Sequence, residues 1–331
     1  MSSTPDTSTS AGIARGFHAG EVAMQARTGA AEKMAGLGSR LIRDHMPDQH
    51  RELFAQLPFM LAGGLDPSGQ PWATLLAGPP GFVDTPDAQT LRIAAQPTAQ
   101  DALAGAFTPG APVGLLGLQP HTRRRNRLNG VVTQAGEAGF AIGVLESFGN
   151  CPKYIQAREA QHVSLPQTGG ALAESARLDA DARRIVAGAD TFFIATAHPD
   201  AGTDASIAYG VDVSHRGGKS GFVRISLDTD ADLLTIPDFT GNSFFNTLGN
   251  IQLNPKVGLL FVDFDGGALV QIAGTATIDH DSPELAHYAG ALRLLRVRIL
   301  AVRRLSGAVP LRWSKPAELS PHLAATGEWP V

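Results

Sequence analysis

The chain has 331 residues, which is too long for one ordinary hydrophobic core and favours two domains. Its net charge of −4 gives no general electrostatic basis for binding nucleic acid or an anionic membrane surface. A single cysteine, Cys151, excludes an internal disulfide and fits a reducing compartment. No apolar run reaches the roughly 20 residues of a membrane span, so we expect a cytoplasmic protein with no membrane partner.

The N-terminal part predicts a tail followed by helix. Residues 1–12 are polar and rich in Ser and Thr, and we interpret them as a disordered tail rather than a signal peptide. The Ala-rich segment from about 16 to 46 is typical of helix. Within it, His18, Glu21 and Gln25 would share one face, which is either a solvated polar stripe or a functional one.

Closely spaced strands follow. Between 58 and 92, two apolar runs flank Asp-Pro-Ser-Gly, which indicates a β-hairpin. We predict a helix over 98–107, two further strands near 113–118 and 127–134, and then a strand that leads into a turn and a helix near 151–158. Short strands at this spacing favour a small antiparallel barrel.

The pattern then restarts after a polar, Gly- and Pro-containing segment that we interpret as a linker, residues 164–182. Val113-Gly-Leu-Leu recurs as Val257-Gly-Leu-Leu, and Gly114 and Gly258 are separated by 258 − 114 = 144 residues. Gly130 and Gly274, and Gly105 and Gly249, have the same offset of 144. Three landmarks at one offset predict a tandem duplication. A helix near 285–295, a strand and a Pro-rich tail end the chain.

An asparagine-rich stretch distinguishes the second copy from the first. Asn242, Asn246 and Asn250 have no asparagine opposite them at the 144 offset, so they are not required by the shared fold. If 242–251 is helical, they lie along one side, and Asn242 lies near a helix start, where free N–H groups favour an anion. Thr247 adds another hydrogen-bonding group.

A basic hairpin is also confined to the second copy. Ser214-His215-Arg216 is followed by two glycines and Lys219, where the first copy has only Ala-Gly-Pro-Pro. Arg216 carries a planar fork suited to phosphate, and Lys219 carries a mobile charge. A helix cap and an exposed hairpin would explain each feature separately, but their joint absence from the first copy favours a phosphate site.

These features resemble the FMN-binding split-barrel superfamily that includes pyridoxamine 5′-phosphate oxidase. The resemblance rests on a strand pair, a helix ending at Asn254-Pro255, then VGLLFVDF and ALVQIAG, over most of 187–280 and more weakly over 55–135. It implies a mainly β protein with flanking helices, in which two tandem antiparallel split barrels form an intrachain pseudo-dimer. It also implies FMN, with the phosphate held by Asn246 and Thr247 together with His215 or Arg216.

The sequence departs from the oxidase at the phosphate site. The oxidase has an Arg-Lys pair where this chain has Asn246-Thr247, and the oxidase's C-terminal substrate pattern is absent. We therefore do not transfer the oxidase activity. The resulting division is a tail (1–12), a helix and first barrel with a degenerate phosphate site (13–163), a linker (164–182), a second barrel with the FMN site (183–315) and a tail (316–331).

Three more residues are candidates for the flavin site. Cys151 and Lys153 lie in an Asn-Cys-Pro-Lys-Tyr segment similar to segments in superfamily members, although Cys151 also fits an ordinary packed cysteine. Gln271 falls opposite Arg127 (271 − 127 = 144) on a strand that the resemblance places against flavin. No residue pattern typical of a metal site or a catalytic triad is found, and no catalytic residue is assigned.

The sequence thus predicts an FMN-dependent oxidoreductase that acts on an unidentified small molecule and takes electrons from a donor such as NAD(P)H. The alternative is a non-catalytic flavin- or haem-binding split barrel, with His121 or His287 as an iron ligand, or a pseudo-dimer with an empty site. Because split barrels of this superfamily typically pair as homodimers, the resemblance is also compatible with a homodimer of such pseudo-dimers.

Overall fold

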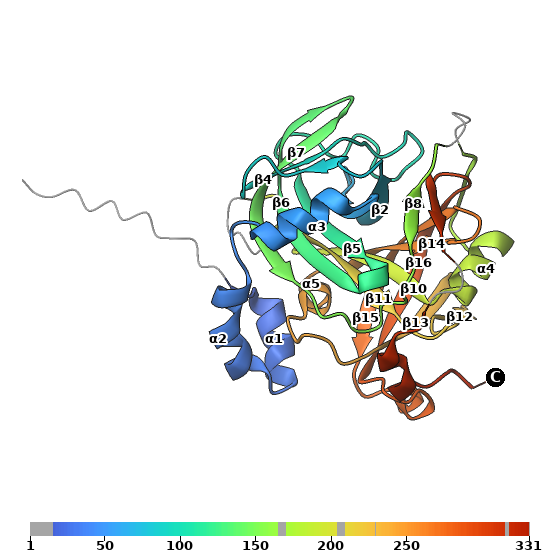
Figure 1. Cartoon of the computed structure of the whole chain (residues 1–331). Helices are drawn as coiled ribbons and strands as arrows, with labels where there is room; N and C mark the ends of the chain where they lie inside the picture. The colour runs from blue at the N-terminus through green and yellow to red at the C-terminus, as the bar shows by residue number, and fades with distance from the viewer. Residues whose placement is uncertain (1–15, 165–169, 204–208, 229, 315–317, 331) are drawn as a thin grey trace, which may run out of the picture.

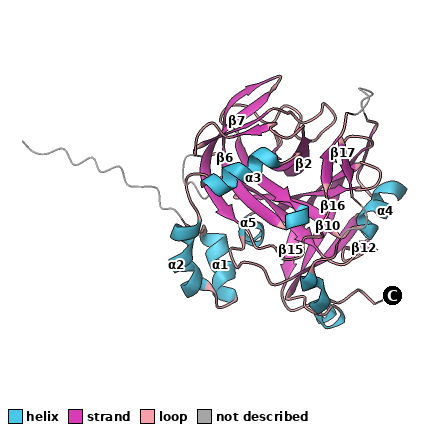
Figure 2. Ribbon diagram, in the orientation of Figure 1, coloured by secondary structure: helices cyan, strands magenta, loops and turns pink. Residues whose placement is uncertain are grey.

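The computed structural model describes residues 16–164, 170–203, 209–228, 230–314 and 318–330. The expected tail at 1–12 lies outside the described residues. Within the described parts the protein is mainly antiparallel β-sheet with peripheral helices, as Figures 1 and 2 show. The expectation of a mainly β protein with flanking helices is confirmed. Among these residues, no helix has the length and apolar character needed to cross a membrane.

The described part of the first half contains three α-helices and one seven-stranded sheet. The sheet order is β2-β1-β5-β6-β7-β4-β3, and all of its neighbouring strands are antiparallel. The elements are α1 (Ala19–Arg27), α2 (Ala31–Leu41), α3 (Asp48–Gln56), β1 (Phe59–Leu65), β2 (Pro71–Ala77), β3 (Val83–Asp84), β4 (Thr90–Ile93), β5 (Pro112–Gln119), the 3₁₀ helix η1 (Pro120–Thr122), β6 (Arg124–Gly136) and β7 (Gly139–Gly149).

The second half repeats that arrangement. Its eight-stranded sheet has the order β11-β10-β14-β15-β16-β13-β12, with β9 added at β16, and β17 pairs separately with β8. The elements are β8 (Ala160–His162), β9 (Leu172–Ser175), α4 (Ala180–Gly188), β10 (Thr191–Ala197), β11 (Val211–Gly217), β12 (Arg224–Leu227), β13 (Asp232–Asp238), α5 (Asn246–Leu253), β14 (Lys256–Val262), β15 (Leu269–Asp279), η2 (Pro283–His287), β16 (Arg293–Leu305), β17 (Leu311–Trp313) and η3 (Pro321–Ala325).

The offset of 144 residues is reproduced in strand register. Val113 pairs with Gly130 on β5 and β6, and Val257 pairs with Gly274 on β14 and β15. The two sheets therefore match both in strand order and in the alignment of individual residues. This correspondence is compatible with a tandem duplication.

The two sheets pack directly on each other through backbone-to-backbone contacts. Strand β2 lies against β10 and β14, and β11 lies reciprocally against β1 and β5. A Cβ atom added at Gly114 would lie 2.3 Å from the carbonyl oxygen of Val211, and one added at Gly258 would lie 2.3 Å from that of Pro71. The matched glycines therefore allow the halves to approach closely. Phe59, Phe193 and Leu260 belong to the apolar core between them.

Helix α1 is held against the second half. A Cβ at Gly20 would lie 2.1 Å from the carbonyl oxygen of Gly249 on α5, so the two helices touch backbone to backbone. His18, Glu21 and Gln25 are all buried at this contact. The polar stripe predicted on this helix is therefore not a solvated face.

Three predicted helices are wrong. Residues 98–107 form turns, in which the Asp101 carboxylate accepts a hydrogen bond from the Leu103 N–H and Gly105 has φ +73°. Residues 151–158 form turns and a bridge, with Tyr154 at φ +63° directly after Pro152-Lys153. Near 285–295 only the short η2 forms, and β16 begins at Arg293, because the segment pairs with β13 and β15.

Two segments that the sequence assigned to a linker and to a tail make ordered contacts with the rest of the protein. Within the expected linker, the described strand β9 pairs with β16, while 165–169 lie outside the described residues. In the expected C-terminal tail, Ser320 and Leu323 are buried, and Ser320 N–H donates to the Gln156 side chain.

We predict that Gly114→Ala destabilises the protein by about 1–3 kcal/mol, because the new methyl group has no room against Val211. Urea unfolding measures the difference. Gly136→Ala is the matched control, since Gly136 also lies on a strand of the first half and has nothing within 4 Å of an added Cβ. Equal stabilities of the two variants would contradict the close packing of the halves.

Candidate functional site

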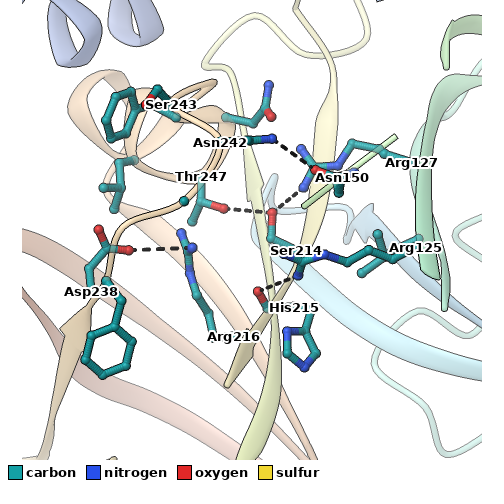
Figure 3. Close-up of a pocket in the computed structure, with 16 residues that line it drawn as sticks. Arg125, Arg127, Asn150, Ser214, His215, Arg216, Asp238, Asn242, Ser243 and Thr247 are labelled. Atoms are coloured by element: carbon teal, nitrogen blue, oxygen red, sulfur yellow. Dashed lines mark hydrogen bonds and ion pairs between the residues drawn. The ribbon is translucent and has the colours of Figure 1, made fainter. Parts of the chain in front are cut away.

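A pocket opens where the two halves meet. One wall comes from β6 and the end of β7 in the first half, and the other comes from β11, the end of β13 and the start of α5 in the second (Figure 3). The polar residues that line it are Arg125, Arg127, Asn150, Ser214, His215, Arg216, Asp238, Asn242, Ser243, Asn246 and Thr247. Neither half could form this pocket alone.

The pocket carries excess positive charge. Three arginines and one aspartate line it. Arg216 lies 3.5 Å from Asp238, but Arg293 also contacts that carboxylate, at 3.4 Å, so a single negative charge faces two cations. Arg125 donates to the backbone oxygens of Cys151 (2.8 Å) and His215 (3.5 Å). Burial lowers the pKa of Arg125 to about 10, which leaves it cationic at neutral pH.

Arg127 joins the halves at the floor of the pocket. Its side chain is buried, and it donates one hydrogen bond to Asp212 at 2.7 Å and another to the Ser214 hydroxyl. Among the described residues, its Nε atom is buried without an acceptor, as is the Nδ2 atom of Asn150 on the same lining. Buried donors are normally satisfied, so both are available to an acceptor that a ligand would supply.

The start of α5 adds further hydrogen-bond donors. The helix begins at Asn246, directly after Phe245 in the left-handed region at φ +62°. The first N–H groups of a helix have no partner within it, and together they favour an anion. Thr247 donates its hydroxyl to Ser214 at 2.9 Å, which fixes the first turn against β11.

Six of the sequence-predicted residues gather here: Ser214, His215, Arg216, Asn242, Asn246 and Thr247. Their local structure differs from expectation, because α5 starts at Asn246 and Asn242 precedes the helix, while Asn250 is buried against Thr196 and Asp212. The His215 ring packs edge-on against Phe193 at 5.8 Å. Burial, then the charges of Arg125 and Arg216, hold the pKa of His215 well below its usual range, so it is neutral.

The other four candidates lie elsewhere. Cys151 and Lys153 line an adjoining hollow that shares Arg125, His215 and Arg216 with the pocket. Lys219 pairs with Glu328 at 3.3 Å and lines neither hollow. Gln271 is fully buried and donates to the oxygens of Ala73 and Asp101, away from the pocket.

Sequence reasoning missed or undervalued the first half's contribution. The sequence pattern does not select Arg125, Asn150 or Asp238, and it identifies Arg127 only as the position opposite Gln271. The available signal was alternation along β6, since residues 125 and 127 share one face of a strand. That signal does not reveal which face meets the other half.

Below the pocket lies a group of buried carboxyl groups. Asp212 accepts hydrogen bonds from Arg127, Asn129 and Asn250, and the Asn129 amide also donates to Glu146 at 3.2 Å. Burial, and next the charge of Asp212, raise the pKa of Glu146 to about 8. Burial raises the pKa of Glu21, which accepts from the Asn246 amide, well above its usual range. Arg127 is thus the cation that pairs with this group of carboxyl groups, and Glu146, with its pKa of about 8, holds a proton near neutral pH.

Comparison with known protein families finds no match, and no curated protein matches the sequence. Solved structures that match include HupZ of Group A Streptococcus (14% identity, 37% of this chain and 90% of that one, TM-score 0.27). A putative pyridoxamine 5′-phosphate oxidase of Lactobacillus delbrueckii matches with 17% identity over 39% of this chain and 94% of that one, at a TM-score of 0.29. An FAD-binding protein of Mesorhizobium loti matches with 14% identity over 41% of this chain and 99% of that one, at a TM-score of 0.26. Each covers about two fifths of this chain, a share compatible with one half. Likeness at these scores carries no argument for function.

We predict that the contribution of Glu146 to stability falls as pH rises from about 5 to about 8.5. The folded state holds the Glu146 proton more tightly than the unfolded chain does, so its contribution is complete below pH 4.5 and is lost as pH rises through about 8. Glu146→Gln cannot ionise and should show a smaller fall in Tm over this range. Glu137→Gln, an exposed change on the neighbouring turn, should keep the wild-type slope. Identical slopes in all three proteins would contradict the buried-proton assignment.

Proposed function

We propose that the pocket at the junction holds the phosphate of FMN, and that the protein is an FMN-binding oxidoreductase acting on a small molecule. The observation that carries the proposal is the pair of unpaired buried donors, Arg127 Nε and Asn150 Nδ2, facing a lining with three arginines. A phosphate supplies several strong acceptors and negative charge, which matches both features. The free N–H groups at the start of α5 add to the same match.

The adjoining hollow suits the remainder of the cofactor. It shares Arg125, His215 and Arg216 with the phosphate pocket, and it adds the aromatic side chain of Tyr154, which lies 5.1 Å from the ring of Phe239, a residue that lines both. Cys151 and Lys153 also line it and would lie near a bound flavin. When bound, the isoalloxazine would supply the electron transfer, and the protein's part would be to position it and tune its surroundings.

This proposal includes the finer view of the fold. We infer two tandem split barrels arranged as an intrachain pseudo-dimer, with one phosphate site per chain. The reciprocal packing of β2 and β11, and the matching strand order of the two sheets, support it. An electron donor such as NAD(P)H and a small-molecule substrate are part of the same proposal.

A non-catalytic flavin- or haem-binding protein is the alternative. For haem, the two histidines singled out in the sequence, His121 and His287, are both exposed and line none of the described cavities. The cationic lining therefore favours a phosphorylated cofactor over haem. The two flavin alternatives differ only in turnover.

We predict that Arg216→Ala weakens FMN binding by roughly 1.5 to 3 kcal/mol, which is roughly 10- to 100-fold in Kd, because a charge-assisted contact to phosphate is lost. Fluorescence titration measures it. Riboflavin, which lacks the phosphate, should bind wild type and variant about equally at this pocket. The control is Gln100→Ala, a substitution in the first half, which should leave FMN affinity unchanged. Equal losses for Arg216→Ala and Gln100→Ala would contradict the assignment.

An absorption spectrum separates binding from turnover. With FMN added, the proposal expects a bound flavin spectrum that NAD(P)H or another donor bleaches. A bound flavin that no donor bleaches would support the non-catalytic alternative. A haem spectrum after haem titration, with no flavin bound, would overturn the FMN assignment.

A further inference from the structure

A second cavity lies at the interface between the halves, next to β2 of the first half, and it is separate from the proposed FMN site. It is bounded by β2, the loop that contains Thr98 and Asp101, and the facing ends of β15 and β16. Its volume is about 350 Å³, against about 80 Å³ for the phosphate pocket. Its volume is within the range of cavities that enclose a whole small molecule, about 300–1,000 Å³.

The register of the strands shows that this cavity is the counterpart of the phosphate pocket. Leu116 pairs with Leu61, which pairs with Leu75, and the matching Leu260 pairs with Phe193, which pairs with His215. Leu75 therefore corresponds to His215. By the same step, Thr74 and Leu76 correspond to Ser214 and Arg216. The 144 offset adds Leu269 opposite Arg125 (269 − 125 = 144).

The two counterparts have opposite chemistry. Where the phosphate pocket has Arg125 and Arg216, the second cavity has Leu269 and Leu76 on its lining. Arg127 reaches from the first half into the second. Its counterpart Gln271 reaches from the second half into the first, where its amide donates to the Asp101 carboxylate and to the Ala73 carbonyl oxygen. No lysine or arginine is among the residues described as lining this cavity.

The one carboxyl group on the lining also disfavours an anion. Asp101 accepts hydrogen bonds from the Thr74 hydroxyl at 2.5 Å, the Leu103 N–H at 2.8 Å and the Gln271 amide at 3.1 Å. An ionised carboxylate has about four acceptor positions, so about one remains for a ligand donor. A phosphate here would lose hydration and meet no arginine or lysine among the lining residues, only the imidazole of His162, so its burial would be costly.

The remaining walls suit a flat apolar ring. They are formed mainly by Leu75, Leu76, Pro97, Leu269, Leu305 and Pro310. Around them, the side chains of Gln96, Thr98, His162 and Ser164 supply hydrogen-bonding groups. Such a lining, with apolar walls and several polar groups, suits a small molecule that has both an apolar ring and hydrogen-bonding atoms.

We propose that this cavity binds an uncharged planar ring compound with an N–H donor, of the dephosphorylated flavin class, beside the FMN held at the junction. The choice of a flavin ring rests on the proposed function, because the cavity is the structural counterpart of the proposed FMN pocket. The loss of the arginines determines the preference for the uncharged form. The protein thus has two structurally corresponding sites: the junction pocket selects the phosphorylated flavin, and the second cavity selects the dephosphorylated form.

The test uses full-length protein saturated with FMN and dialysed against riboflavin, with both flavins separated chromatographically and counted. We expect one riboflavin per chain in addition to FMN. Thr98→Trp and Ala308→Trp, two ways to fill the cavity, should each remove riboflavin and leave FMN bound. Arg216→Ala should have the reverse effect, with FMN bound roughly 10- to 100-fold more weakly and the cavity's riboflavin kept. Circular dichroism confirms that each variant is folded.

The outcomes separate this inference from the proposed function. FMN bound with no additional riboflavin overturns the inference alone. Additional riboflavin that a folded Trp variant does not displace also overturns it, because the ligand then lies elsewhere. Riboflavin displaced by the Trp variants, with no FMN bound by wild type, overturns the FMN proposal and leaves the second site standing.

Discussion

The crossing of Arg127 from β6 onto Asp212 and Ser214 of β11 is the interaction on which the site depends. It is buried, it links the two halves, and it brings a guanidinium to the floor of a pocket that neither half could form. A buried ion pair often adds little net stability, since both charges lose their hydration. Here its role is positional: it fixes one cation where an anion can reach it.

Close packing of the two halves makes that crossing geometrically possible. The matched glycines Gly114 and Gly258 let each sheet touch the other's backbone, and the reciprocal crossing at Gln271 follows from the same arrangement. Pseudo-symmetry therefore creates two counterpart cavities, whereas the side chains that line them are free to diverge. Charge distinguishes them: arginines line one, and leucines occupy the corresponding positions of the other.

The sequence predicted what depends on local pattern and on the repeat. The two sheets have the same strand order, which is compatible with the predicted duplication, and the Ser214–Arg216 and Asn246–Thr247 segments line one pocket. Prediction from the sequence failed where tertiary contacts determine the local structure. Residues 98–107 have good helix formers, yet Asp101 is committed to Thr74 and Gln271, and the segment forms turns instead. Arg125 and Asn150 could not be assigned, because only the packing of two distant segments shows that they face Arg216.

We expect the junction between the two halves to bind a phosphate, and a crystal structure of the protein with FMN is the decisive measurement. The phosphorus should lie within hydrogen-bonding reach of Arg127 and the start of α5, with donors from both halves around it. A phosphate between Leu76 and Leu269, or anywhere outside the junction, would rule out this site.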